Sequence, residues 1–90
     1  MAGNILGMDV QAARDMARTF TSNADTITQV AQTLTNQLQG VTWLGRDGDQ
    51  FRSNWQSTHV PNLTRICDEL RAASQTMGQQ ADQQEQASSA

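Results

Sequence analysis

The 90-residue sequence has no tyrosine, no lysine, one proline and one cysteine, and only four of its residues are aromatic. A single proline and β-branched residues that do not alternate make an all-β fold a poor interpretation. All six basic residues are arginines, scattered among nine acidic residues, which leaves a net charge of −3. We therefore expect no nucleic-acid binding and no stable membrane insertion, since there is no basic patch and no apolar run near the roughly 18 residues of a spanning helix.

Residues that could perform catalysis are equally scarce. His59 and Cys67 are the only histidine and cysteine, and a helix would hold them about 12 Å apart, too far for a nucleophile and its base. No group of cysteine, histidine and carboxylate side chains has the spacing of metal ligands. The segment 45–48 lacks the lysine and hydroxyl residue of a phosphate-binding loop. The sequence predicts a non-enzymatic protein without cofactor or metal. His59 is expected to be partly exposed, with a pH switch or a ligand role as the alternative. Cys67 is expected to be a packing residue, with an intermolecular disulfide as the alternative.

A long stripe of apolar residues predicts a first helix over about 9–40. Asp9 is placed to cap its N-terminus, and Gly40 fits a C-terminal cap. Between them apolar residues recur at spacings of three and four, the pattern of a helix that packs against another helix. The stripe consists of Val10, Ala13, Ala17, Phe20, Ala24, Ile27, Ala31, Leu34, Leu38 and Val41. Met16 and Val30 widen the apolar face, which suits contact with more than one neighbouring helix.

A second helix is predicted over about 47–77. It begins with Asp47-Gly48-Asp49-Gln50, where an acidic cap and a glutamine three positions later form the pattern of a capping box. Its apolar residues fall into two stripes of different phase, namely Phe51 and Trp55, then Leu63, Ile66, Leu70, Ala73 and Met77. Pro61 lies near the change of phase and lacks the N–H that a continuous helix needs. We expect a kink near Pro61; two separate helices are the alternative.

Trp43-Leu44-Gly45 stands between the two helices, in a predicted turn over 41–46. Glycine permits the backbone conformation of a tight turn, and an indole can plug the end of a helix pair. For Trp43, packing alone and packing combined with contact to another protein both remain open. The predicted fold is an all-α antiparallel helix-turn-helix hairpin over 9–77, with flexible segments at 1–8 and 78–90.

A single hairpin covers each apolar stripe on one side only. It buries too little apolar area to offset the ordering of its chain, at roughly 1.5 kcal/mol per residue. Two hairpins packed as a four-helix bundle dimer solve this problem, and both a homodimer and a heterodimer satisfy it. The side chains expected in the hairpin or dimer interface are Ala17, Phe20, Ala24, Ile27, Ala31, Leu34, Leu38, Phe51, Trp55, Leu63, Ile66, Leu70 and Met77.

With its central Trp43-Leu44-Gly45 between two heptad-patterned helices, the chain resembles the WXG family over nearly its whole length. These proteins are helical hairpins of about a hundred residues, the Esx-type substrates of type VII secretion. The resemblance implies a homo- or heterodimeric four-helix bundle, export without a cleaved signal peptide, and capture by a membrane ATPase. The first eight residues have no basic flank and no long apolar core, which disfavours a conventional signal peptide. Arginine in place of lysine is compatible with an actinobacterial source.

The sequence departs from the family in its export signal. In the family this signal is a tyrosine followed four residues later by Asp or Glu, and here those positions are occupied by Gly78 and Asp82. Only the acidic half is therefore present. The departure favours a heterodimer in which a second WXG-type hairpin supplies the tyrosine. A helical interaction module that stays inside the cell is the alternative, and a secreted membrane-active effector is disfavoured by the acidic charge.

Overall fold

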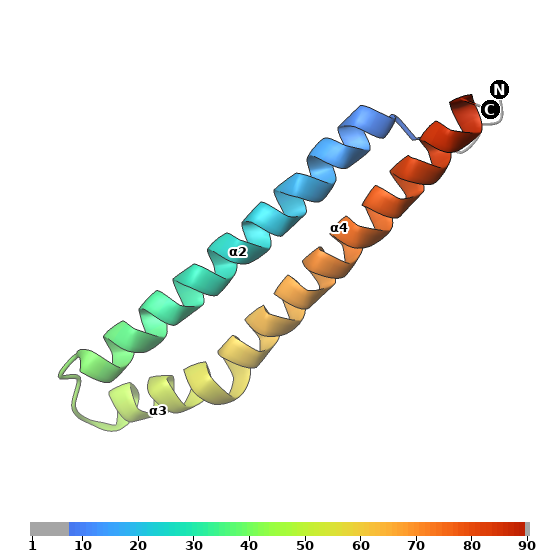
Figure 1. The fold of residues 1–90 in the computed structure, drawn as a ribbon. Coiled ribbons are helices and arrows are strands. Elements are labelled where there is room, and N and C mark those ends of the chain that lie inside the picture. Colours follow the sequence, from blue (N-terminus) through green and yellow to red (C-terminus); the bar gives the residue numbers. More distant parts are fainter. Residues whose placement is uncertain (1–7, 90) are drawn as a thin grey trace.

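The computed structural model describes residues 8–89, which form an antiparallel helical hairpin measuring 65 × 17 × 13 Å (Figure 1). Helix α2 (Val10–Gly40) is the first limb, and helix α3 (Arg46–Asn54), the π-helical turn η1 (Trp55–His59) and helix α4 (Val60–Ser89) together make the returning limb. Among the described residues there is no strand. The predicted all-α hairpin is therefore confirmed for the single chain.

Helix α2 has the predicted bounds but a different C-terminal cap. The Asp9 carboxylate accepts a hydrogen bond of 3.0 Å from the Ala12 N–H and caps the first turn, as predicted. At the other end, Val41 is extended and its N–H donates to the Gln37 carbonyl at 2.9 Å. The prediction of a glycine cap at Gly40 is wrong, because the chain leaves the helix through this extended residue and needs no left-handed glycine there.

The returning limb begins one residue earlier than predicted. Its N-cap is Gly45, with φ at +105°, and no side chain caps the helix there. The predicted capping box led by Asp47 is therefore absent. The reason is that the positive φ of Gly45 turns the chain into the helix before Asp47 is reached. The carboxylates of Asp47 and Asp49 instead lie in the first turn, where their negative charges interact favourably with the positive end of the helix dipole.

The change of phase in the second helix corresponds to the π-helical turn. The Val60 N–H donates to the Trp55 carbonyl, five residues back, so this turn holds one residue more than an α-helical turn. Counting back from Leu63 in heptads reaches positions 56 and 52, whereas the aromatic residues lie one position earlier, at 55 and 51. One extra residue produces this offset. The limb stays continuous and bends at η1 (Figure 1), so the predicted kink lies just before Pro61.

Deleting Ser57 is expected to remove the π-helical turn and leave the hairpin folded, with the free energy of unfolding changed by at most about 1 kcal/mol. The shortened chain places Phe51 and Trp55 in heptad phase with Leu63 on one uninterrupted helix. Thermal unfolding followed by circular dichroism measures this. As the control, deleting exposed Asp68 rotates every later residue of α4 by about 100° and should unfold the protein. Equal losses from the two deletions would contradict the assignment of the extra residue.

The predicted flexible tail at 78–90 is wrong as far as Ser89, because α4 continues to that residue. Ala81 is completely buried against the beginning of α2, and Arg14 forms ion pairs with Asp82 at 2.7 Å and with Glu85 at 3.1 Å. Alanine, glutamine and glutamate are also good helix formers. The predicted loose segment 1–8 lies outside the described residues except for Met8, which is half-buried.

The seam between α2 and α4 is built from small side chains. Ala24 and Ala81 have no exposed surface, and Ala17 and Cys67 are 8% and 5% exposed. Small residues let two helix backbones approach closely. Further predicted interface residues are half-buried along the same seam, namely Phe20, Ile27, Ala31, Leu38, Leu63, Leu70 and Met77.

Two predicted seam positions are occupied by neighbouring residues. Cys67 is buried in the place expected for Ile66, whose side chain is 46% exposed. Half-buried Thr35 takes the place of Leu34, which is 40% exposed. The heptad pattern located the apolar sector of each helix but assigned its centre about one position away. The prediction that Cys67 packs in the interior is confirmed.

Candidate protein-interaction surface

The turn places Trp43, Leu44 and Gly45 at the tip of the hairpin. Trp43 is 41% exposed and Leu44 is 86% exposed, so the tip presents apolar surface to solvent. The rest of the Trp43 indole packs on Gly48, where a methyl group would lie only 2.9 Å from the ring atom Cγ. Trp43 therefore contributes both packing and exposed surface.

A row of aromatic rings extends from the turn along the returning limb. The ring centroids of Trp43 and Phe51 are 5.9 Å apart, those of Phe51 and Trp55 are 6.3 Å apart, and those of Trp55 and His59 are 6.1 Å apart. Such contacts stabilise aromatic pairs by about 0.5–1.5 kcal/mol beyond their burial. Phe51, at the centre of the row, remains 40% exposed, so the row forms part of the surface.

Trp55 connects the two limbs just above the turn. Its side chain is 8% exposed, and its indole N–H donates a 2.9 Å hydrogen bond to the hydroxyl of Thr35. That hydroxyl donates in turn to the Ala31 carbonyl of its own helix at 2.7 Å. The polar atom of the buried indole is thus satisfied across the seam, which supports the prediction that Trp55 is a packing residue.

Arg52 is the residue at the turn that sequence reasoning missed. Its guanidinium donates to the carbonyls of Leu38, Val41 and Trp43 at 2.9, 3.1 and 2.9 Å, and it lies 5.9 Å from the centre of the Trp43 ring. Arginine can serve several acceptors because its planar fork carries five N–H donors. No pattern in the sequence marks this role, since one arginine beside an apolar stripe is typical of any amphipathic helix.

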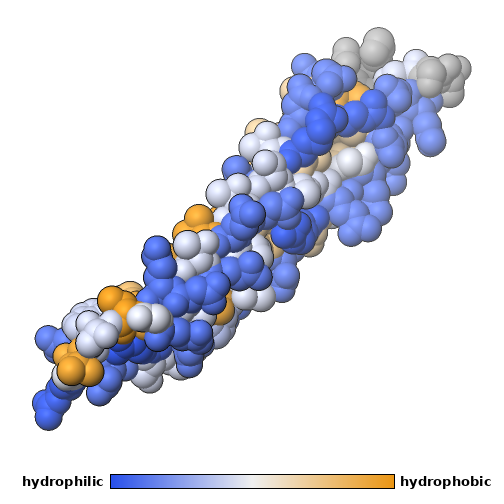
Figure 2. All heavy atoms as spheres, turned by 60° about the vertical axis from the view of Figure 1, so that its left-hand side comes forward, coloured by the Kyte–Doolittle hydropathy of each residue, from blue (hydrophilic) through white to orange (hydrophobic). Residues whose placement is uncertain are grey.

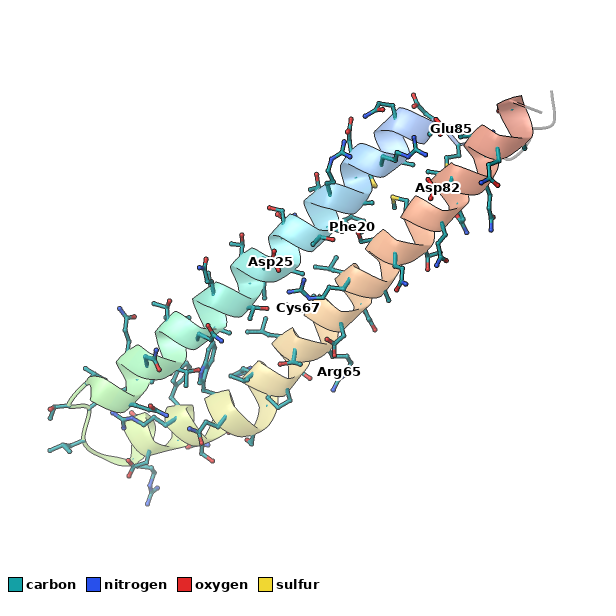
Figure 3. All side chains as sticks on the ribbon, viewed as in Figure 1. Phe20, Asp25, Arg65, Cys67, Asp82 and Glu85 are labelled. Carbon is teal, nitrogen blue, oxygen red and sulfur yellow. The ribbon has the colours of Figure 1, made fainter. Side chains whose placement is uncertain are left out.

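One side of the seam carries polar contacts between the limbs. The hydroxyls of Thr21 and Ser74 lie 2.9 Å apart, and Arg71 forms a 2.8 Å ion pair with Asp25. The Cys67 thiol, which points into the seam in Figure 3, donates to the Ala24 carbonyl at 3.5 Å. A groove on this side is lined by Ile27, Thr28, Ala31, Gln32, Thr35, Asn36, Val60, Leu63, Thr64 and Cys67.

The ion pairs of Arg14 with Asp82 and Glu85 lie on the polar side of the seam, at the end of the hairpin opposite the turn, where Figure 3 labels both acidic residues. The hydrogen bond from Arg14 lowers the pKa of the Glu85 carboxyl below its ordinary value, with a further contribution from the arginine's charge. The hydrogen bonds from Arg14 to Glu85 and, to a smaller extent, to Asp82 raise the pKa of the Arg14 guanidinium. Both partners therefore remain charged at neutral pH, but solvent screens exposed pairs of this kind.

The other side of the seam is apolar. Met16, Val30 and Leu34 of α2 and Ile66 of α4 are 51%, 51%, 40% and 46% exposed. On α2 these residues flank the seam opposite to Arg14, Thr21 and Asp25, and on α4 Ile66 flanks it opposite to Arg71 and Asp82. Because the two limbs are antiparallel, both apolar flanks lie on one side of the hairpin. We call the four residues Met16, Val30, Leu34 and Ile66 the apolar face.

Figure 2 shows hydrophobic side chains gathered mainly in the half of the molecule that ends at the turn. Scattered single apolar residues are common on protein surfaces, whereas a continuous exposed patch is typical of an interaction site. Val30 and Leu34 of the apolar face and the exposed Val41, Trp43 and Leu44 of the tip lie in this half, whereas Met16 lies near the opposite end of α2.

The positions that correspond to the family's export signal lie within α4. Gly78 is half-buried in the helix, with no atom within 4 Å of the site of an added methyl group, and Asp82 forms its ion pair with Arg14. Both residues are thus part of the ordered hairpin. The aspartate is held by the first helix of the same chain.

Searches for similar proteins do not identify a relative: no family model, curated protein or solved structure matches the chain. Within residues 8–89, no helix combines the length and apolar character that crossing a membrane requires. In the same part of the chain, no three histidine, cysteine or acidic side chains gather as ligands for a metal ion. The surface features above are the basis for a functional proposal.

Proposed function

We propose that the chain is a WXG-family protein, a non-enzymatic substrate or adaptor of type VII secretion that acts as half of a helical-hairpin dimer. The observation that carries the proposal is the placement of Trp43-Leu44-Gly45 at the exposed tip of a two-limbed hairpin. On this proposal the protein is made in the cytoplasm and secreted. A membrane ATPase of the secretion machine recognises the dimer before export.

The apolar face supports the dimer part of the proposal. Its four residues are large, lie on one side of the seam and are 40–51% exposed in the single hairpin. Burying apolar surface contributes about 25 cal/mol per Å², and a thin core of small residues supplies little of this within one chain. A second hairpin laid on the apolar face completes a four-helix bundle.

A heterodimer agrees best with the missing tyrosine, because a partner hairpin would supply the complete signal. The chain has Gly78 at the tyrosine position, and its Asp82 is held by Arg14. The second candidate function is a helical interaction module that stays inside the cell, which the missing tyrosine also favours. The two functions differ in whether the protein leaves the cell.

Ile66→Asp is expected to weaken association by tenfold or more, because it places a charge at the centre of the apolar face. The control is Thr64→Asp, at an exposed position on the polar side of the same helix, which should associate as the wild type does. Light scattering over a range of concentrations measures this for the chain alone and with its co-purified partner. A stable, fully helical wild-type monomer that retains no partner would contradict the dimer.

Extracellular detection in the native host, with and without the secretion ATPase, tests the export part. We expect the protein outside the cells only when the ATPase is present. We also expect Trp43→Ala to reduce export more than it reduces helicity, because 41% of the side chain faces solvent. Equal extracellular amounts in both strains would remove the export claim and leave the intracellular module.

A further inference from the structure

We propose that residues 79–89 form a strap that opens about Gly78 while the rest of the hairpin stays folded, and that the ion pairs of Arg14 with Asp82 and Glu85 hold this strap closed. The inference goes beyond the proposed function and does not depend on it. The strap is the last part of α4 and lies beside the beginning of α2, at the end of the hairpin opposite the turn (Figure 3).

Gly78 separates two unlike parts of α4. Before it, large apolar side chains are half-buried along the seam as far as Met77, and the Ser74 hydroxyl donates to the Ala17 carbonyl of α2 at 2.7 Å. After it, residues 79–89 contain no large apolar side chain. The first part is therefore held by burial and hydrogen bonds, whereas the strap buries much less apolar surface.

The buried residues of the strap are an alanine and a glutamine. Ala81 is completely buried and Gln84 is 3% exposed. Burial contributes in proportion to apolar area, and a methyl group and an amide provide little of it. Gly78 adds a weak point at the junction, because glycine in a helix interior is less favourable than alanine.

Arg14 supplies a contact that crosses from α2 to two carboxylates of the strap. Its Nη2 donates to Asp82 Oδ1 at 2.7 Å, and its two terminal nitrogens donate to the two oxygens of Glu85 at 3.1 Å each. The bidentate arrangement with Glu85 fixes the direction of the guanidinium. Asp82 and Glu85 lie three positions apart on one helix, so one arginine reaches both.

Helix segments with few buried contacts open at a lower free energy than the core of a protein. Exposed ion pairs contribute little each and are screened by salt. Because the strap has few apolar contacts, this modest contribution is enough to shift the balance between its closed and open states. Opening uncovers Val10 and Ala13, which are half-buried at the same end of α2, without disturbing the turn.

The variant Arg14→Gln tests the contact in the full chain by amide hydrogen exchange measured by NMR. We expect exchange of residues 79–89 to accelerate about threefold to tenfold, while exchange of residues 60–77 stays within about twofold of the wild type. The double variant Asp82→Asn, Glu85→Gln should accelerate the strap by the same factor. Adding Arg14→Gln to the double variant should have no further effect, because the three changes remove the same contacts.

The matched control is Arg18→Gln, which removes the same charge one turn further along α2, where the arginine pairs with Asp15 of its own helix. It should leave exchange of the strap unchanged. Raising sodium chloride from about 0.05 to about 1 M should accelerate the strap in the wild type but not in Arg14→Gln. Gly78→Ala should slow its exchange about twofold to fivefold, since alanine strengthens the helix at the junction.

Unchanged exchange of residues 79–89 in Arg14→Gln, or an equal acceleration in Arg18→Gln, would overturn the role of Arg14. An increase that extends equally through residues 60–77, or unfolding of the whole hairpin, would show that the strap does not open separately. If Gly78→Ala did not slow the exchange, the opening would not begin at Gly78. A gradual rise toward the C-terminus that is the same in every variant would be ordinary fraying of a helix end and would contradict the proposal.

Discussion

Replacing Trp55 with alanine is expected to unfold most of the protein. Removing a buried tryptophan costs about 3–5 kcal/mol, and a domain of this size has only a few kcal/mol of stability. Trp55 is 8% exposed, stacks on Phe51 and bonds to Thr35 of the other limb, so one substitution removes all three contributions. Far-UV circular dichroism against temperature measures the loss.

The matched control is Trp55→Phe. It keeps most of the apolar ring and removes the indole N–H, while the Thr35 hydroxyl still donates to the Ala31 carbonyl. We expect a loss of about 1 kcal/mol, the usual net contribution of one hydrogen bond. Equal, small losses from the alanine and phenylalanine variants would show that the indole is not a packing centre and would return Trp55 to the candidate contact residues.

Replacing Gly48 with alanine is expected to destabilise the hairpin and displace Trp43, although alanine is the better helix former by about 1 kcal/mol. A Cβ atom at Gly48 would lie 2.5 Å from the Trp43 carbonyl oxygen and 2.9 Å from Cγ of its indole. A backbone oxygen cannot rotate away, so the turn must move, and overpacking of this kind costs about 1–3 kcal/mol. Thermal unfolding and the fluorescence of Trp43 in a Trp55→Phe background report the two effects.

Gly78→Ala is the control for the propensity term. Gly78 lies inside α4, and no atom approaches within 4 Å of its missing Cβ. This substitution should raise the free energy of unfolding by about 0.5–1 kcal/mol. If Gly48→Ala stabilised the protein as much as Gly78→Ala does, Trp43 would not pack on this glycine.

Heptad spacing was sufficient to predict the two limbs. Regular recurrence of apolar residues identifies a helix with one buried sector, because the period of 3.6 residues returns side chains to the same face. The discontinuity between Trp55 and Leu63 was also visible in the sequence. Its interpretation as a kink was correct, while its cause, one extra residue in a π-helical turn, depends on which carbonyl the Val60 N–H reaches.

The tail could not be predicted from local composition. Residues 78–89 contain few apolar side chains, and such segments are usually disordered when they pack on nothing. Here Ala81 is buried against α2, and Arg14 pairs with Asp82 and Glu85 about seventy positions further along the chain. A segment of weak intrinsic preference becomes helical because the other limb supplies contacts that the local sequence does not reveal.

By itself the sequence determined the helical class, the hairpin, the position of the turn and the burial of Trp55, because these follow from periodicity and from the special chemistry of glycine and tryptophan. The tertiary structure decided the helical state of the tail, the exchange of Ile66 for Cys67 in the seam, and the separation of a polar side from an apolar face. It also assigned Arg52 to the turn. These features depend on the rotation of one helix against the other and on the direction of single side chains, which a repeating pattern of residues does not specify.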